Sequence, residues 1–336
     1  MIKPSLIRKY IGMAGAAIAL GLAGGVAGAA DHIDLPAAAG GGVLMRPDAS
    51  ITDFFAFISG NKLVLALDVN PNLDPAVQTY RFPTDVSYKF NIDLNSPVTI
   101  GTDVISKEFG GVITRPASIT EDLVFEVTFD SRNRPRLNVT GADSGRCESI
   151  RPRVRMFTGL RAEAFIFAPA VRNNIGSIVL EVPVSSVLQG QSKLLLWATT
   201  TVDTPQGKFT ELGARALRSQ FPPNAGLNAI HPSQHVAAGF VRPDVMILDV
   251  SKPSSFPNGR IMSDDVVDEV ATFTTLPTDR NAANGEIAQC SPGGIAFPCP
   301  VEPSATADDI RILGRFPYLG RPYTLSERNA ASSSID

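Results

Sequence analysis

The side chains of this chain that could do chemistry are mainly carboxylates, and the first group of them lies near the start. Asp31, His32 and Asp34 precede Asp48 and Asp53. Loop carboxylates offer the oxygen ligands that Ca²⁺ prefers, and a histidine among them suits a transition metal. The pattern therefore predicts a metal site, with Ca²⁺ as the first ion to test. The spacing matches neither an EF-hand nor a metalloprotease helix, so the alternative is that these groups cap turns and pair with arginines.

A second acidic group consists of Asp264, Asp265 and Asp268, with Arg260 just before it. On a helix, positions 264 and 268 share a face, so their carboxylates would be neighbours. That face would suit Ca²⁺ or a general acid–base pair. The alternative is that the acids stabilise the helix amino terminus, where carboxylates favour the dipole, while Arg260 neutralises one of them.

Two histidines also have a spacing of interest. His231 and His235 would lie on one face of a helix, which is the geometry of a two-histidine metal site. Pro232 follows His231 directly, so His231 lies at best at a helix start. No glutamate follows it as in His-Glu-x-x-His, which weakens the metal interpretation.

The chain has three cysteines. Cys290 and Cys299 enclose a loop rich in proline and glycine, and the oxidising environment of an exported protein favours a disulfide between them. Cys147 is then left over, either buried or free. The sequence has no Gly-x-Ser-x-Gly elbow, phosphate-binding loop or dinucleotide motif, so no reaction can be assigned from a motif.

The start of the chain has the pattern of an export signal. Lys3, Arg8 and Lys9 precede an apolar stretch over residues 11–26, and Ala27-Gly28-Ala29 fits signal peptidase. Residues 1–29 are therefore predicted to be a signal peptide, and the mature protein is expected in the periplasm or outside the cell, without a membrane span. The formal charge of −3 becomes −6 once the three basic residues are removed. This acidic balance argues against a nucleic-acid partner.

Short runs rich in β-branched and aromatic residues, separated by Asn, Pro, Gly and Asp, dominate the sequence. They predict strands over residues 54–58, 63–69, 86–92, 123–129, 154–157, 164–167, 177–182 and 193–200.

Helical patterns are few: residues 264–273 have one apolar face, and residues 211–220 are a weaker candidate. The fold class expected is mainly β, an antiparallel β-sandwich with long loops and a few short helices. Residues 30–325 are predicted to form one elaborated domain, followed by a frayed tail over residues 326–336. A split into two domains near residue 145 is the alternative.

Several segments share their residues with a known family. They are Asp31-His32-x-Asp34-x-Pro36, residues 48–57, 157–161, 242–249, 256–268 and 316–320, and the most specific of them is the block Asn258-Gly-Arg-x-x-x-Asp-Asp-Val-Val-Asp268. Together they resemble the bacterial secreted family called domain of unknown function 4331, across essentially the whole mature chain. The resemblance implies no activity. Residues 161–165 depart from the family pattern, because one acid and a proline are missing there.

The function expected from these observations is binding rather than catalysis. An exported β-sandwich with many loop acids and no catalytic motif fits a protein that holds a small ligand, a metal ion or a partner of the cell envelope. One alternative is an exported metal-dependent hydrolase that uses His32 and the nearby aspartates. Another is a structural protein of the surface or matrix.

Overall fold

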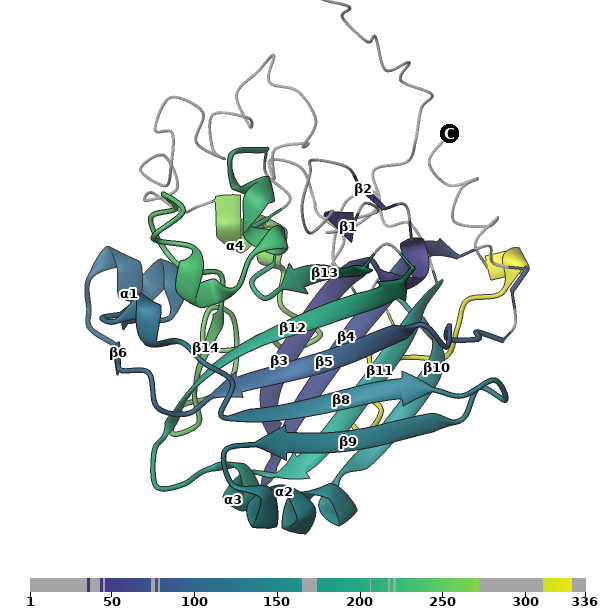
Figure 1. The fold of residues 1–336 in the computed structure, drawn as a ribbon, viewed down its shortest axis with the longest axis horizontal. Coiled ribbons are helices and arrows are strands. Elements are labelled where there is room, and N and C mark those ends of the chain that lie inside the picture. The colour runs from purple at the N-terminus through teal and green to yellow at the C-terminus, as the bar shows by residue number, and fades with distance from the viewer. Residues whose placement is uncertain are drawn as a thin grey trace, which may run out of the picture.

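The molecule is built from two antiparallel sheets that lie face to face (Figure 1). The computed structural model describes residues 35–36, 43–44, 46–73, 76–77, 79–164, 174–205, 207–216, 218–219, 222–271 and 311–327. The predicted fold class, a mainly β antiparallel sandwich with long loops and a few short helices, is confirmed.

The larger sheet has six strands in the order β13–β12–β5–β8–β9, and β14 pairs with the other end of β12. Figure 1 shows this sheet in front of the smaller one. The strands are β5 (Val86–Asp93), β8 (Leu123–Phe129), β9 (Pro135–Gly141), β12 (Lys193–Thr204), β13 (Gly207–Gly213) and β14 (Met246–Asp249).

The smaller sheet has four strands in the order β10–β11–β4–β3. They are β3 (Ile51–Ser59), β4 (Lys62–Leu73), β10 (Arg155–Ala162) and β11 (Asn174–Pro183). A two-residue turn joins β3 to β4, since Ser59 pairs with Lys62, and Gly60 has a φ of 59° there. Glycine adopts this left-handed conformation without steric cost.

Short elements complete the described part of the chain. Two small ladders pair β1 (Leu35–Pro36) with β2 (Val43–Leu44) and β6 (Val98–Thr99) with β7 (Val112–Ile113). The α-helices are α1 (Val104–Phe109), α2 (Ser144–Ile150), α3 (Val184–Val187) and α4 (Val266–Ala271). The 3₁₀ turns are η1 (Pro47–Ala49), η2 (Pro116–Ser118), η3 (Arg151–Arg153), η4 (Pro222–Ala229) and η5 (Pro232–Gln234). None of these helices is long and apolar enough to cross a membrane.

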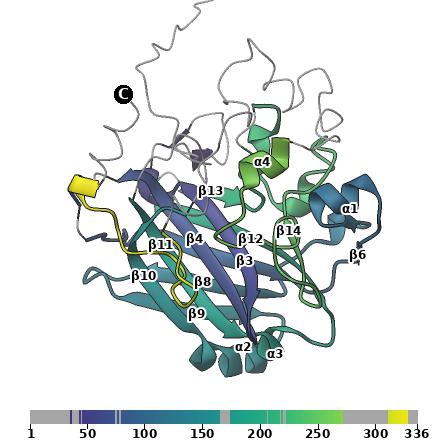
Figure 2. The ribbon, with the colours of Figure 1, turned by 180° about the vertical axis from the view of Figure 1, so that it is seen from behind.

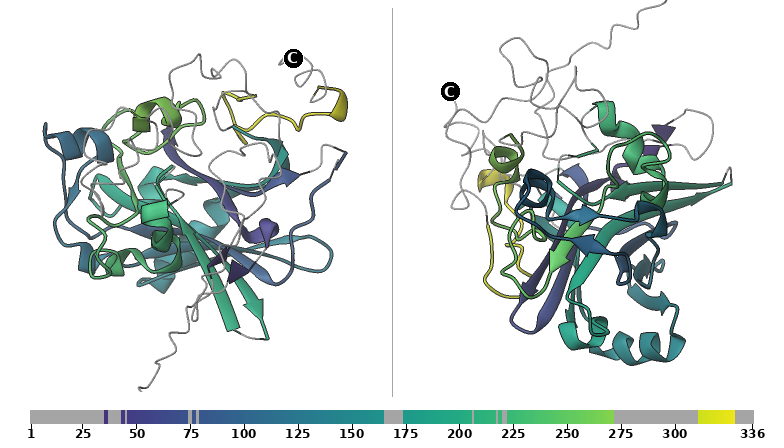
Figure 3. Two further views of the ribbon diagram at one scale, coloured as in Figure 1. Left: turned by 90° about the horizontal axis from the view of Figure 1, so that it is seen from above. Right: turned by 90° about the vertical axis from the view of Figure 1, so that its left-hand side faces the viewer.

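The views from above and from the side show the two sheets as layers (Figure 3), and the core lies between them. Side chains alternate along a strand, so each strand presents one row to this core and the other row to the outer face. In β4, the leucines at 63, 65 and 67 enter the core, while Val64, Ala66 and Asp68 lie on the outer face. The outer faces of the two sheets then differ in what covers them.

Two segments, residues 256–262 and 311–323, cover the outer face of the four-stranded sheet, and we call them the covering segments. The second of them crosses this face in yellow in Figure 2. Phe55 and Phe57 of β3 pack here against Met262, Tyr318 and Leu319. Gly259 allows the close approach, because a Cβ atom there would lie 2.4 Å from the Ala56 carbonyl oxygen. The neighbouring Arg260 amide donates a hydrogen bond to that carbonyl.

One sequence-based expectation about an element is wrong, and a second falls mostly outside the described residues. Residues 211–220 were expected to be helical, but Glu211 and Leu212 belong to β13 and pair with Thr200 and Thr199 of β12. Cross-strand pairing and burial override the local helical preference there. The strand expected at 164–167 begins with Ala164, which lies outside any strand, while residues 165–167 fall outside the described part of the chain.

Candidate functional site

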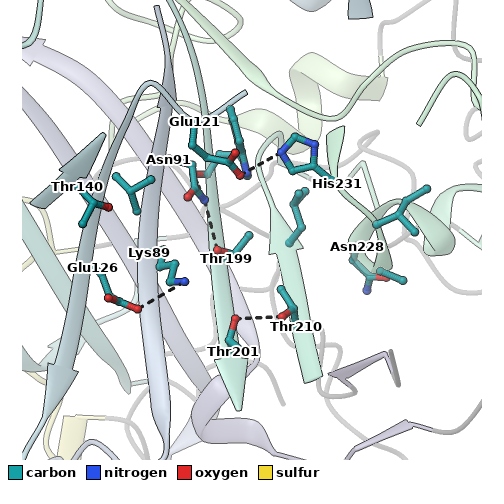
Figure 4. A pocket seen from close by; sticks show the side chains of 15 residues that line it. Lys89, Asn91, Glu121, Glu126, Thr140, Thr199, Thr201, Thr210, Asn228 and His231 are labelled. Carbon is teal, nitrogen blue, oxygen red and sulfur yellow. Dashed lines mark hydrogen bonds and ion pairs between the residues drawn. The ribbon is translucent and has the colours of Figure 1, made fainter. Parts of the chain in front are cut away.

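A polar cleft of about 610 Å³ lies on the outer face of the six-stranded sheet (Figure 4). Its volume falls within the range of about 300–1,000 Å³ that is typical of small-molecule sites. The floor is the sheet, and a wall is formed by the chain between η4 and η5. The lining residues are Lys89, Asn91, Glu121, Val124, Glu126, Thr140, Trp197, Thr199, Thr201, Thr210, Leu212, Asn228, Ala229, Ile230 and His231.

Because side chains alternate along each strand, the polar side chains of one face form the floor of the cleft. In β12, Ala198, Thr200 and Val202 face inward, so Thr199 and Thr201 face the cleft. The register then brings neighbours into contact across strands, and Thr201 lies opposite Thr210 of β13. Their hydroxyl oxygens are 3.0 Å apart. The result is a row of hydroxyl groups in the cleft.

The charged groups of the floor are paired with one another. The Lys89 ammonium lies 3.5 Å from the Glu126 carboxylate across β5 and β8. Asn91 donates hydrogen bonds of 3.3 Å to the Trp197 carbonyl and to the Thr199 hydroxyl. The floor therefore offers donors and acceptors without an excess charge.

The wall is held in place by His231, which precedes η5. Its Nδ1 accepts a hydrogen bond from the Ser233 amide, so the ring proton lies on Nε2 and is directed at Glu121, 3.0 Å away. The ring also packs edge-on against Trp197, with 5.7 Å between ring centroids. The hydrogen bond from His231 holds the pKa of Glu121 below its usual value, against the opposing effect of burial.

Trp197 lies in an apolar run of β12 and is fully buried. It belongs, however, to a small cluster on the outer face of the sheet with Leu195, Leu212 and Val245. Its indole nitrogen has no hydrogen-bond partner among the described residues. Trp197 therefore supports the cleft from below and is not a surface on which a ligand could stack.

The structure describes only some of the residues that were predicted to bind a metal. Asp31, His32 and Asp34 lie outside the described residues, as does the side chain of Asp268. Asp265 lies directly before α4. In the described part of the chain, no three His, Cys, Asp or Glu side chains lie close enough together to hold a metal. The metal site at these residues stays a prediction.

Asp53 lies on the outer face of β3, beneath the covering segments. Its carboxylate forms an ion pair of 2.6 Å with Arg260, and both side chains are 1 % exposed. Arg260 in turn stacks on the Phe55 ring. Asp53 therefore pairs with an arginine, which is the alternative to metal binding that the sequence offers for this group of acids.

Asp68 lies directly opposite Asp53 in the ladder between β3 and β4, and Ser177 of β11 lies opposite Asp68 on its other side. Burial raises the pKa of Asp68 well above its usual value, and the negative charge of Asp53 raises it further. Burial also raises the pKa of Asp53, although the charge of Arg260 opposes this effect. One arginine thus accompanies two buried carboxyl groups, and Asp68 is the one that favours its uncharged form.

Asp264 accepts hydrogen bonds from other residues of the chain segment that precedes α4. Its carboxylate accepts hydrogen bonds of 2.8 Å from the Ser255 hydroxyl and from the amides of Phe256 and Ile261. These bonds fix the covering segment that contains Arg260. The role is structural, and it differs from both the metal and the acid–base hypotheses for this residue.

His235 does not form a metal pair with His231. Its Nδ1 accepts a hydrogen bond from the Asp244 amide, and its Nε2 lies 2.9 Å from the Leu227 carbonyl oxygen and 3.0 Å from that of Ile230. Both ring nitrogens are therefore engaged by backbone groups. Burial lowers the pKa of His235, which agrees with a neutral structural histidine.

Cys147 is a free thiol that is buried in the core next to β9. Burial raises its pKa, so the reactive thiolate is disfavoured. The predicted disulfide partners Cys290 and Cys299 lie outside the described residues.

Comparison with known proteins adds little to this geometry. No family model matches the chain, and the search of curated proteins found no relative. Among solved structures, one similar chain is the collagen-binding subdomain of the Enterococcus faecalis surface protein ACE. The match covers 48 % of this chain and 92 % of that one, at 11 % identity and a TM-score of 0.16. The site must therefore be interpreted from its own chemistry.

Proposed function

We propose that this protein is an exported, non-catalytic binding protein whose polar cleft holds a small, uncharged, hydroxyl-rich ligand. The observation that supports the proposal is the composition of the cleft, where threonine hydroxyls and two asparagine amides lie among charged groups that are already paired. A hydroxyl both donates and accepts a hydrogen bond, so such a lining complements ligand hydroxyls. A strongly charged ligand would have to compete with the existing ion pairs.

The same contacts support binding rather than turnover. Both ring nitrogens of His231 are engaged, one by Ser233 and the other by Glu121. The Lys89 ammonium lies beside Glu126. A general base must be within hydrogen-bond reach of the proton that it removes, and these groups are directed at one another.

The test uses neutral saccharides as probes: maltose, cellobiose and N-acetylglucosamine dimers, measured by isothermal titration calorimetry on the full chain. Thr201→Val keeps the shape of the side chain and removes its hydroxyl, so we expect roughly a two- to tenfold weaker affinity. Thr128→Val is the matched control, because Thr128 lies on β8 of the same sheet but does not line the cleft. The proposal fails if no neutral saccharide binds, or if Thr201→Val and Thr128→Val bind equally well.

Export is part of the proposal and has its own test. Amino-terminal sequencing of the protein recovered from the periplasm of a Gram-negative host should begin at Ala30 or Asp31. An uncleaved chain retained in the cytoplasm would contradict export.

A metal at Asp31, His32 and Asp34 is a separate proposal. Elemental analysis of protein purified without chelator should find about one Ca²⁺ per chain, and EDTA should lower the melting temperature. Protein that contains no metal and melts at the same temperature in EDTA would contradict it.

A further inference from the structure

A second concavity, which we call the apolar groove, shares no lining residue with the polar cleft. It has a volume of about 200 Å³ and lies between α1, β7 and residues 236–247. Its apolar lining includes Ile105, Phe109, Val112, Ile113, Val236 and Val241. The groove is therefore lined mainly by apolar side chains, and it lies outside the core between the two sheets.

The groove concentrates the exposed apolar surface of the molecule. Six large hydrophobic side chains are exposed in the described part of the chain, and three of them line this groove. These three are Val112, Val236 and Val241, with exposed fractions of 37 %, 40 % and 46 %. A fourth, Val104, begins α1, the helix that contributes Ile105 and Phe109. Exposed apolar side chains gathered around a concavity are typical of a binding site.

The same groove contains two guanidinium groups and, among the described residues that line it, no carboxylate. Arg215 and Arg242 lie over the Phe109 ring, 4.0 Å and 4.3 Å from its centroid. Arg218 lies 5.6 Å from the same centroid. The charges of Arg215 and Arg218 also act on the buried Asp244 carboxyl, so the positive charge along this wall of the apolar groove is partly compensated.

These arginines are held in place before any ligand arrives. Arg215 is 9 % exposed and Arg218 is 3 % exposed. Arg218 donates a hydrogen bond to the Arg242 carbonyl, and the Arg215 amide donates one to the buried Asp244 carboxyl. Side chains that are already ordered lose little conformational entropy when they bind an anion.

We propose that the apolar groove binds a small amphiphilic carboxylate, with its alkyl chain on the valines and its carboxylate on Arg242 and Arg215. Guanidinium groups bind carboxylates through two parallel hydrogen bonds, and an apolar environment strengthens that contact. Sites for drug-sized ligands have volumes of about 300 Å³ or more. The groove is smaller than this, so a ligand with a short alkyl chain fits best. This second site is independent of the polar cleft.

The experiment compares three probes that share one alkyl chain: octanoate, 1-octanol and octylammonium. Each is titrated into the full chain by calorimetry, below its micelle concentration. We expect octanoate to bind at least tenfold more tightly than octanol, and octylammonium to bind more weakly than either. Equal affinity for octanoate and octanol, or no binding of octanoate, would overturn the proposal.

Two variants separate the contribution of the ligand's carboxylate from that of its alkyl chain. Arg242→Gln should reduce the affinity for octanoate to that for octanol and leave octanol binding unchanged, while Val241→Ser should weaken both ligands by severalfold. Because Val241 is exposed, its variant should fold normally. Arg132→Gln, in the exposed turn before β9, is the matched charge control and should change neither affinity. Octanoate affinity that is the same in Arg242→Gln and Val241→Ser as in the original chain would also overturn the proposal.

Discussion

The outer faces of the two sheets hold the same kinds of charged side chain in opposite environments. On the four-stranded sheet, Asp53, Asp68 and Arg260 are at most 3 % exposed beneath the covering segments. On the six-stranded sheet, the side chains of Lys89 and Glu126 are 35 % and 28 % exposed in the polar cleft. Solvent screens charges on the open face and is excluded from the closed one. Charges on the closed face should therefore act on folding, and those on the open face should act on a ligand.

The largest expected effect is the loss of the only described cation in contact with Asp53. Arg260→Met leaves two carboxyl groups buried without their arginine, and removal of one partner from a buried pair typically costs about 3–5 kcal/mol. Urea unfolding should show this loss in the free energy of unfolding. The control is Arg155→Met, because Arg155 lies 3.6 Å from Glu181 and is 65 % exposed. A loss no larger than that of the control would mean that the closed face is not electrostatically distinct.

The next prediction concerns Asp68, whose contribution to stability should change with pH in a defined direction. Because burial raises its pKa in the folded protein, folding favours the protonated form, which Asn mimics at every pH. The contribution of Asp68 to stability is then fully present below its unfolded pKa of about 3.9 and is lost as the pH rises through the folded pKa. The stability advantage of Asp68→Asn should grow by about 1.4 kcal/mol per pH unit across that window.

Urea unfolding of both proteins from pH 4 to pH 8 measures this difference. Asp85→Asn is the control, since the hydrogen bond from Arg46 lowers the pKa of Asp85, so its pH window lies below this range and its stability difference should stay constant from pH 4 to pH 8. Its stabilising contribution is present above the unfolded pKa and is lost as the pH falls through the folded one. A difference between Asp68→Asn and the original chain that does not change with pH would show that Asp68 is charged in the folded state.

The strands could be predicted from the sequence because their signal is local. The alternation in residues 86–92 and 123–129 indicates one buried and one polar face, and β5 and β8 follow it closely. The failure at 211–220 has a tertiary cause, since those residues pair with β12, which no local pattern reveals. Polar residues at alternate positions of β5 also indicated a polar outer face, but not that a wall would turn it into a cleft.

The sites depend on contacts between distant parts of the chain. Asp53 was singled out among the candidate metal-binding acids, but its partner Arg260 lies in the covering segment far along the sequence, where no local pattern reveals the pairing. His231 was singled out for its spacing to His235, whereas its actual partners are Glu121 and Trp197. The types of residue were visible in the sequence, and their pairing was not.

A smaller effect is expected at the wall of the cleft. Glu121→Gln removes the charge that accepts the hydrogen bond from His231, and a partly exposed pair contributes about 0.2–1 kcal/mol. The lowered pKa of Glu121 means that this contribution is present above the unfolded pKa and is lost as the pH falls through the folded one. Saccharide affinity should fall more clearly than stability, because His231 orients the wall. Unchanged affinity with lowered stability would instead assign the pair to folding alone.

The smallest effect on stability is expected at the floor of the cleft, where the comparison is sharpest. Lys89→Met and Glu126→Gln each break an exposed pair, so each should cost about 1 kcal/mol or less in urea unfolding. They change the charge of the cleft in opposite directions, and we expect Glu126→Gln to favour acidic sugars such as glucuronate, and Lys89→Met to disfavour them. Calorimetry with glucuronate and glucose measures both shifts. If the two variants instead lose as much stability as Arg260→Met and bind glucuronate equally, exposure does not separate the roles of the two faces.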